Sequence, residues 1–340
     1  ADQKFREMKR RDFIKGSLIG TGALAISGLG SKSAEAARIP KKWDVESDVV
    51  ILGLGGAGAC AAIEAADAGA KVLILEKQPN DKLINNTRMS GGIFHSPDPT
   101  GNREALKAYA KAMFSGENIP GKLEGEQPDV SDGLAEAWAE YAPKNVDFLK
   151  KLDPAFNTVA FSRFAGAAFP TFPGAKESKY MVFGSSFTGK ADFATPTMNA
   201  PKSEKMNGEA FFLVLREAVE KRKARILWET PAKRLILNDK GEVIGVVGER
   251  KDGKEVFCKA RRAVIITTGG YEYSVPMRRA FLKGPGVEGW AFYGTPENTG
   301  DGIAMAMMAG AGLAKVGKAA SRIITAVPIR FHGLKMGLIT

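Results

Sequence analysis

The chain has 340 residues, of which 44% are hydrophobic and 26% are charged, an ordinary composition for a globular protein of about two domains. Its formal net charge is +11, but no basic stretch alternates with aromatic residues as a nucleic-acid groove requires, so we expect no nucleic-acid partner. With two cysteines and two histidines, the sequence predicts no metal site built from these residues, no iron–sulfur cluster and no attached haem.

The N-terminal region, residues 1–43, has the pattern of an export signal followed by a linker. Arg10 and Arg11 form a twin-arginine pair, residues 18–29 are weakly apolar, and the Ala-Glu-Ala at 34–36 is typical of a cleavage site. The apolar stretch is too short and too rich in glycine to cross a bilayer, so we expect no transmembrane segment. This pattern predicts a periplasmic or otherwise extracytoplasmic protein; a disordered basic N-terminus is the alternative.

The next region has the pattern of a dinucleotide-binding βαβ unit. An apolar run, Val49–Leu52, leads into glycines at 53, 55 and 58, a helix of small residues follows, and a second apolar run ends at Glu76. These glycines permit a tight turn, a close approach to a pyrophosphate and close helix–strand packing. The helix N-terminus favours phosphate, and the Glu76 carboxylate would accept hydrogen bonds from ribose hydroxyls. A purely structural glycine turn is the alternative. The preceding strand, the following helix and the acid at Glu76 together favour a nucleotide-binding site.

The remaining elements complete an α/β fold. Helical spacing predicts helices over 103–114, 134–152 and 209–223, whereas 154–208 is irregular. Short strands are predicted over 225–228, 232–237, 243–247, 256–259 and 263–267, with hairpin turns at 238–241 and 251–254. The last strand is fully apolar, so we expect it in the centre of a parallel sheet. The predicted class is a Rossmann-like domain with a parallel central sheet, a β-meander and a helical insertion.

Four loops, taken in order, resemble those of the FAD-dependent oxidoreductase 2 family, which includes the flavoproteins of fumarate reductases, succinate dehydrogenases and 3-oxosteroid dehydrogenases. They are the glycine fingerprint ending in Glu76-Lys77, Asn-Thr-x-x-Ser-Gly-Gly at 86–92, Thr-Gly-Gly at 268–270 and Thr-Gly-Asp-Gly at 299–302. The resemblance covers about residues 46–95 and 205–315. It implies that the βαβ unit is part of a Rossmann-like FAD-binding domain.

The resemblance also implies which residues contact FAD. Ala57 and Gly58 would meet the pyrophosphate, Glu76 the adenosine ribose, and the 86–92 loop the flavin side. Ala232 would pack near the adenine, and Asp301 would be a further contact. The full set of expected cofactor-binding residues is Gly53, Gly55, Ala57, Gly58, Glu76, Lys77, Asn86, Thr87, Ser90, Gly91, Gly92, Ala232, Thr268, Gly269 and Asp301.

Two departures from the family pattern bear on the expected chemistry. Membrane-bound members carry a histidine at the Asn86 position for covalent flavin attachment, which asparagine cannot form, so we expect FAD to be held non-covalently. Fumarate reductases place a substrate histidine about where Arg322 stands, which weakens a fumarate assignment.

By the same resemblance, the FAD-binding domain has two parts, 44–105 and 205–315, separated by a helical and irregular insertion at 106–204. Residues 316–340 would begin a capping domain that is mostly absent, so we expect a truncated family member. Because that domain carries the proton donor in the family, we assign no catalytic residue. The candidates for handling a proton or orienting an anion, all better explained by packing or surface roles, are Tyr271, Tyr273, Arg163 and His95.

The function expected from these features is an exported FAD-dependent oxidoreductase. It would transfer hydride between flavin N5 and an activated C–C bond of a small carbonyl or carboxylate compound, such as a fumarate-like enoate or a 3-oxosteroid-like enone. Electrons would pass to or from a separate partner, such as a cytochrome or a quinol-linked protein. The alternatives are a catalytically silent FAD-binding fragment and, with less support, an NAD-dependent dehydrogenase, in which the 86–92 loop and Asp301 would have no role.

Overall fold

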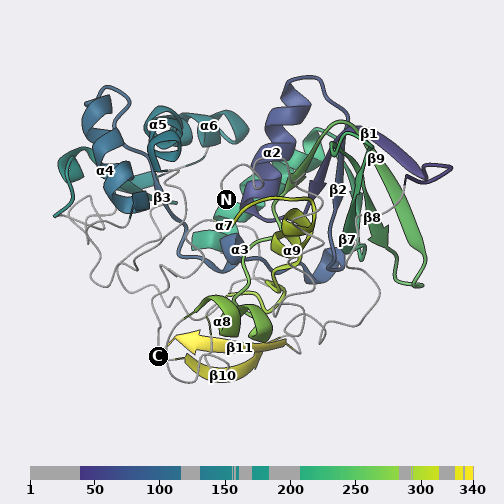
Figure 1. Ribbon diagram of the computed structural model, residues 1–340. Helices are drawn as coiled ribbons and strands as arrows, with labels where there is room; N and C mark the ends of the chain where they lie inside the picture. Colours follow the sequence, from purple (N-terminus) through teal and green to yellow (C-terminus); the bar gives the residue numbers. More distant parts are fainter. Residues whose placement is uncertain are drawn as a thin grey trace, which may run out of the picture. The chain divides into compact units, whose positions relative to one another are not determined.

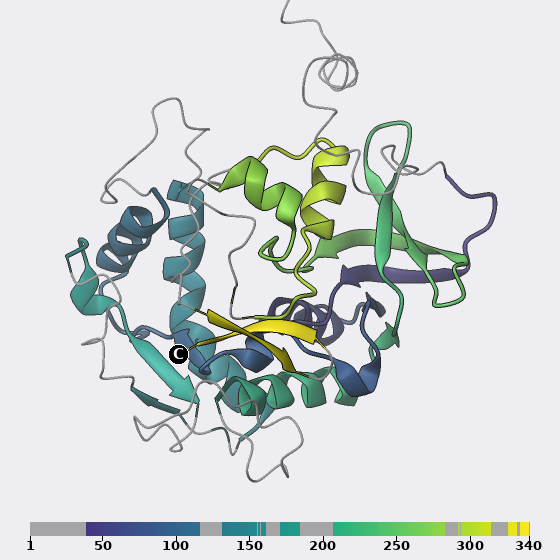
Figure 2. The same cartoon turned by 90° about the horizontal axis from the view of Figure 1, so that it is seen from below.

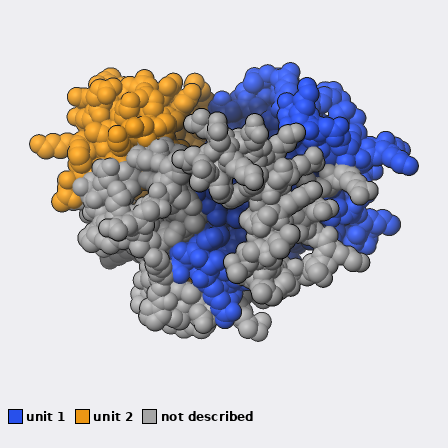
Figure 3. Space-filling model, viewed as in Figure 1, with its two compact units in different colours: residues 1–83, 224–290, 296–321 blue, residues 84–223, 291–295, 322–340 orange. Residues whose placement is uncertain are grey.

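The computed structural model describes residues 39–115, 131–154, 156, 158–160, 171–183, 207–282, 292, 294–313, 326–331 and 334–339 (Figure 1). The predicted export signal, Arg163 and Arg322 lie outside these residues. The chain forms two units, coloured separately in Figure 3. Unit 1 contains residues 1–83, 224–290 and 296–321, and unit 2 contains residues 84–223, 291–295 and 322–340.

Unit 1 is built on a six-stranded sheet in the order β6-β2-β1-β9-β8-β7. Its strands are β1 (Val45–Leu52), β2 (Val72–Leu75), β6 (Arg225–Leu227), β7 (Ala232–Leu237), β8 (Val243–Glu249) and β9 (Glu255–Ile266). β6, β2, β1 and β9 are parallel, whereas β7, β8 and β9 form an antiparallel meander. Both runs of the βαβ unit are buried, which explains their continuous apolar character. The predicted α/β class is confirmed.

One predicted interruption of the sheet is wrong, because the predicted strands 256–259 and 263–267 form one strand, β9, which ends at Ile266. Residues 255–259 pair with β8, and residues 258–266 pair with β1, so the strand changes neighbours along its length. Arg261 and Arg262, which lie between the two predicted strands, are exposed side chains within β9. Arg261 lies 3.2 Å from the Glu46 carboxylate of β1, so the charges are accommodated at the sheet surface.

The helices of unit 1 are α2 (Gly56–Asp67), α8 (Val275–Phe281) and α9 (Asp301–Met308). α2 packs against β1, β2 and β9, and its buried residues are small or apolar: Gly58, Ala59, Ala62 and Ile63. α9 buries Met305 in the core that lines one face of the sheet. The two hairpin turns form as predicted, with hydrogen bonds from Asn238 N to Glu242 O and from Arg250 N to Lys254 O.

Unit 2 is mostly helical. Its helices are α3 (Asn86–Met89), α4 (Arg103–Ser115), α5 (Ser131–Tyr141), α6 (Asn145–Leu152) and α7 (Asn207–Lys221). α4 and α5 pack side by side (Figure 2). The predicted helix over 134–152 is divided, because a 3-10 turn at Ala142–Lys144 contains Pro143, which has no backbone N–H for an α-helical bond.

Unit 2 also contains strands where the sequence analysis expected irregular structure. β3 (Ile93–His95), β5 (Tyr180–Phe183) and β4 (Thr158–Ala160) form a small antiparallel sheet, so residues 158–160 and 180–183 depart from the irregular structure predicted for 154–208. β10 (Ala326–Phe331) and β11 (Leu334–Ile339) form a separate antiparallel pair. Among the described residues, no helix has the length and apolar character needed to cross a bilayer.

Candidate functional site

The glycine turn after β1 is closed by the end of β9. Gly53 has φ +97°, and a Cβ at Gly58 would lie 2.1 Å from the Gly53 carbonyl oxygen. The Thr267 hydroxyl contacts the carbonyl oxygens of Leu52 at 2.9 Å and Gly53 at 3.0 Å. The turn therefore requires glycine at both positions and is held by Thr267, a residue that the sequence analysis did not single out.

α2 begins directly at this turn. Gly55 is its N-cap residue and provides no side-chain cap, and Ala57 in the first turn is exposed. A helix N-terminus presents backbone N–H groups and the positive end of the helix dipole, an arrangement that favours an anionic group. With no bulky side chain at 55–57, an anion can approach the backbone at this end of α2.

Glu76 lies at the end of β2 with 4% of its surface exposed. One carboxylate oxygen accepts the N–H of Leu54 at 2.7 Å, and the other accepts the N–H of Gln78 at 2.9 Å. Burial raises the pKa of Glu76, while these two N–H groups act to lower it. Because a carboxylate has about four lone-pair sites, both oxygens can still accept a hydroxyl. The acid therefore supports the glycine turn and keeps the capacity to bind a sugar.

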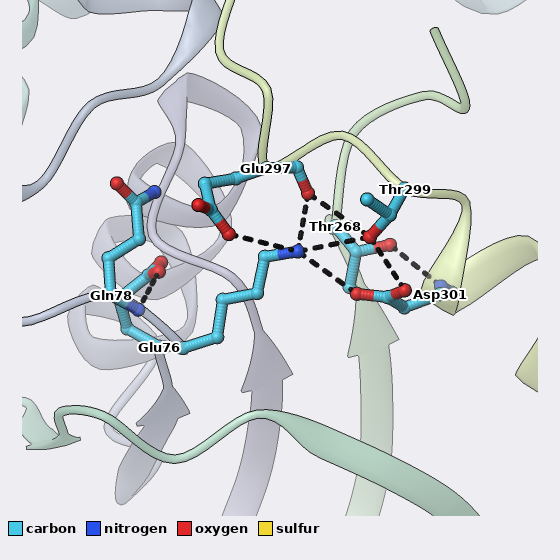
Figure 4. A network of polar contacts seen from close by, with 8 residues as sticks. Glu76, Gln78, Thr268, Glu297, Thr299 and Asp301 are labelled. Atoms are coloured by element: carbon cyan, nitrogen blue, oxygen red, sulfur yellow. Dashed lines mark hydrogen bonds and ion pairs between the residues drawn. The ribbon is translucent and has the colours of Figure 1, made fainter. Parts of the chain in front are cut away.

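The Lys77 ammonium is bonded to oxygen atoms of Glu297, Thr299 and Asp301, the residues before and at the start of α9 that are labelled in Figure 4. It lies 3.2 Å from the Thr299 hydroxyl, 3.1 Å from the Asp301 carboxylate and 3.5 Å from the Glu297 carboxylate. It also bonds to the carbonyl oxygen of Glu297. The sequence resemblance implies Lys77 and Asp301 as cofactor contacts, and the structure brings these two side chains together.

Thr268 and Gly269, at the end of β9, are also tied to the segment before α9. The Thr268 hydroxyl accepts the N–H of Gly302 at 3.1 Å, in the first turn of that helix (Figure 4). A Cβ at Gly269 would lie 2.4 Å from the side-chain oxygen of Asn298, which is buried. These contacts join the third and fourth loops of the sequence resemblance into one structure.

Ala232, at the start of β7, follows a segment that is bonded to the end of β2. The backbone N–H of Thr230 donates to the carbonyl oxygen of Glu76 at 2.8 Å. Ala232 itself is half-buried and packs against the sheet core. Ten of the expected site residues belong to unit 1: Gly53, Gly55, Ala57, Gly58, Glu76, Lys77, Ala232, Thr268, Gly269 and Asp301.

The other five expected residues, Asn86, Thr87, Ser90, Gly91 and Gly92, belong to unit 2. The Asn85 side chain caps α3 by accepting the N–H of Arg88 at 2.9 Å. The Ser90 hydroxyl donates to the carbonyl oxygen of Thr87 at 2.8 Å and accepts the N–H of Gly92 at 3.1 Å. The Asn86 side-chain oxygen accepts the N–H of Thr295 at 2.8 Å. Side chains of this loop thus shape its own backbone.

α7 supports the same loop through an ion pair that the sequence analysis missed. Arg88 binds Glu209 with two hydrogen bonds, of 2.5 Å and 2.9 Å, and the side chains are only 13% and 6% exposed. Gly208 donates its N–H to the carbonyl oxygen of Ser90 at 2.9 Å. Glu209 in a first helical turn is typical of ordinary helices, so the sequence held no clear signal for its partner.

The described candidates for proton transfer are placed in packed surroundings. The Tyr271 ring packs edge-on against Phe281 at a centroid distance of 5.6 Å, and burial raises the pKa of Tyr271. Tyr273 donates its backbone N–H to the carbonyl oxygen of Asn298. In unit 2, His95 packs edge-on against Trp138, and burial lowers the pKa of His95 to about 4. No catalytic role is assigned to any of them.

Comparison with known proteins gives matches along most of the chain. A family model described as an FAD binding domain matches residues 48–335. The chain is 28% identical over 282 residues to the acrylate reductase flavoprotein subunit of Shewanella woodyi, which covers 80% of this chain and 48% of that protein. It is 24% identical over 312 residues to the NADH:fumarate oxidoreductase of Klebsiella pneumoniae, which covers 92% of this chain and 29% of that protein.

Among solved structures, a 3-ketosteroid-Δ4-(5α)-dehydrogenase from Rhodococcus jostii RHA1, in complex with 4-androstene-3,17-dione, has a TM-score of 0.63 and 25% identity. The match covers 81% of this chain and 56% of that chain. The chain thus spans about half the length, or less, of the relatives and structure named here.

Proposed function

Because the chain belongs to the family of flavoproteins with this FAD-binding domain, we propose that it carries the FAD site of an oxidoreductase acting on a C–C bond. FAD is the cofactor of the family, and the features of unit 1 fit its dinucleotide part. The observation that carries the proposal is the joined glycine turn, buried acid and uncapped helix start, formed by Gly53, Glu76 and α2.

Each element of this site has a role toward FAD in the proposal. The N-terminus of α2, with Ala57 and Gly58, would receive the pyrophosphate, because backbone N–H groups and the helix dipole favour a dianion. Glu76 would accept hydrogen bonds from the ribose hydroxyls. Its negative charge would also disfavour a phosphorylated ribose, which supports selection of FAD over a 2′-phosphorylated nucleotide.

By the sequence resemblance, the 86–92 loop would contact the flavin through Asn86, Thr87, Ser90, Gly91 and Gly92. Ser90 and the Arg88–Glu209 pair maintain the loop conformation, so backbone groups rather than long side chains would meet the flavin. The position of Asn86 supports non-covalent binding, since an amide does not act as the nucleophile that a covalent bond to flavin requires. We therefore propose FAD held by hydrogen bonds and packing alone.

When bound, FAD supplies hydride transfer to or from a carbon–carbon bond activated by a carbonyl or carboxylate group. The names of the relatives, acrylate reductase and fumarate oxidoreductase, support small enoates, whereas the solved 3-ketosteroid dehydrogenase supports enones. We propose a substrate from these two classes, with a cytochrome or quinol-linked electron partner. Export by the twin-arginine route is a further part of the proposal.

The test uses the purified chain with FAD reduced anaerobically and followed at the flavin absorbance maximum. Fumarate, acrylate and 4-androstene-3,17-dione are then added separately. Reoxidation of the flavin by at least one of these compounds would support the proposal. Succinate is the control, because it has no C=C bond to reduce and should leave the flavin reduced. If the chain binds FAD but none of these compounds reoxidises the flavin, the result would instead favour the alternative, a catalytically silent FAD-binding fragment. Failure to bind FAD would overturn both the proposed oxidoreductase function and this alternative.

A further inference from the structure

We propose that Lys77 is a positioning residue, which holds the turn Glu297–Asp301 against the end of β2 and leaves the phosphates of FAD to other groups. The inference rests on FAD binding by unit 1, and it assigns to Lys77 a role different from the direct cofactor contact that the sequence resemblance implies.

The contacts of the ammonium support this role. An ammonium has three protons to donate, and four oxygen atoms surround this one: a carbonyl and a carboxylate oxygen of Glu297, the Thr299 hydroxyl and an Asp301 carboxylate oxygen. The Lys77 side chain is 25% exposed. Its hydrogen-bonding capacity is therefore used within the protein, so a phosphate would have to displace one of these partners.

The turn that Lys77 holds connects two neighbouring loops of the site. The Thr299 hydroxyl donates to Asp301 at 2.8 Å, and the N–H of Gly300 donates to the carbonyl oxygen of Gly270 at 3.0 Å. β2 and β9 lie on either side of β1 in the sheet. Lys77 consequently links the end of β2 to the Glu297–Asp301 turn, which is bonded to the residues that follow β9. Because β1 lies between β2 and β9, this link connects the two strands that flank the glycine turn.

The Lys77 charge also acts on Glu76. Burial raises the pKa of Glu76, the Lys77 ammonium and the N–H groups of Leu54 and Gln78 act against that rise, and the Glu297 carboxylate adds to it. Without the ammonium, the Glu297 and Asp301 carboxylates would lose the cation that they share, and Glu76 would lose a nearby positive charge. Glu76 would then take up a proton at a higher pH, and a protonated acid is a poorer acceptor for the N–H of Leu54 and for ribose.

The experiment measures FAD affinity by flavin fluorescence, without substrate, from pH 5.5 to 8.5, on full-length Lys77→Met, Lys77→Arg and Thr299→Ala. Lys254→Met is the matched control, because Lys254 is 81% exposed and pairs with Asp252 in a hairpin turn. Circular dichroism of each apo-protein reports folding.

Lys77→Met is expected to weaken FAD binding by about tenfold at pH 7 and to move the acid-side loss of affinity to higher pH. Lys77→Arg keeps the charge and should restore most of the affinity and the wild-type pH profile, and Lys254→Met should match wild type. Thr299→Ala should weaken binding severalfold, because the turn loses the hydroxyl that joins Lys77 to Asp301. A direct phosphate role for Lys77 predicts the opposite for Thr299→Ala, since the ammonium would be released toward the ligand.

Unchanged affinity and pH profile in Lys77→Met, or equal or tighter binding in Thr299→Ala, would overturn the inference. If Lys77→Met does not fold, Thr299→Ala decides alone: weaker binding supports the inference, and equal or tighter binding overturns it. Wild-type binding with unaffected variants would overturn the inference alone, whereas a wild-type chain that binds no FAD would overturn the proposed function with it.

Discussion

The Glu76 carboxylate accepts the backbone N–H of Leu54 at 2.7 Å, so the acid that ends β2 is bonded directly to the glycine turn that follows β1. A dinucleotide-binding acid is usually considered for its contact with ribose. Here the same side chain also holds the glycine turn, because one of its oxygens accepts the N–H of Leu54 in that turn and the other accepts the N–H of Gln78. In the proposed site, one residue would therefore couple the sugar and phosphate parts.

Glu76→Gln is expected to weaken FAD binding by about tenfold to a hundredfold. The amide NH2 would face one of the two backbone N–H groups, and the ribose would lose a charged acceptor. Together these changes should cost roughly 1.5–3 kcal/mol of the free energy of FAD binding. Isothermal titration with FAD measures the effect. Glu64→Gln, at an exposed position of α2, is the matched control and should bind as wild type. Equal affinities of wild type and Glu76→Gln would contradict the assignment of Glu76.

Gly58→Ala should lower both the stability of unit 1 and its FAD affinity. Its Cβ would lie 2.1 Å from the Gly53 carbonyl oxygen and 2.8 Å from the Thr267 hydroxyl, so α2 must shift away from the turn. We expect a loss of about 1–3 kcal/mol in the free energy of unfolding, measured by urea denaturation. Gly133→Ala is the control, because its Cβ meets nothing within 4 Å in α5 and should stabilise the helix by about 0.5–1 kcal/mol.

The sequence predicted the βαβ unit well because its signals are local. Apolar runs, glycines and the acid at Glu76 lie within one stretch, and each reports directly on the backbone around it. The same local reasoning failed between the predicted strands 256–259 and 263–267, because β9 continues through the exposed Arg261 and Arg262. Charge pattern alone does not report which neighbour a strand pairs with.

The supporting contacts of the site were not predictable in this way. Lys77 and Asp301 are separated by 224 residues, and Arg88 and Glu209 by 121, so only the folded chain shows that they pair. Lys and Arg beside a cofactor motif are naturally interpreted as ligands of an anion. The structure instead shows both cations engaged by carboxylates of the protein, which is why Lys77 is better understood as a positioning residue.

Breaking the Arg88–Glu209 pair should be strongly destabilising. Arg88→Met leaves the Glu209 carboxylate in a position that is 6% exposed, and we expect a loss of roughly 3–5 kcal/mol in the free energy of unfolding. Arg88→Met combined with Glu209→Met should recover part of this loss, because no charge is left buried. Arg216 and Glu220 of the same helix form a less buried pair, with side chains 23% and 52% exposed, and Arg216→Met is the control that should cost less than about 0.5 kcal/mol. Equal losses from Arg88→Met and Arg216→Met would contradict the prediction.

His95 should make stability depend on pH between 6.5 and 4. Burial lowers its pKa from 6.5 to about 4, so within this window the unfolded chain binds a proton that the folded chain does not. The contribution is complete above pH 6.5 and is lost as the pH falls toward 4, by roughly 3 kcal/mol at most. Urea denaturation across this range should show a smaller decrease for His95→Phe than for wild type, since phenylalanine keeps the packing on Trp138 without titrating. Parallel decreases in the two proteins would exclude His95 as the source.

We expect FAD to leave the protein completely on denaturation, because by the sequence resemblance Asn86 stands where membrane-bound members of the family carry the histidine of the covalent bond. The asparagine amide nitrogen is delocalised into its carbonyl group and does not attack the flavin, and its oxygen accepts the N–H of Thr295 at 2.8 Å. After acid precipitation of the FAD-loaded chain, the flavin absorbance should be recovered in the supernatant, and the pellet should show no flavin fluorescence after washing. Asn86→Ala should also release all its flavin but should bind FAD more weakly, since the bond to Thr295 that positions the loop is lost. Flavin retained in the washed wild-type pellet would show a covalent link at some other residue and would contradict non-covalent binding.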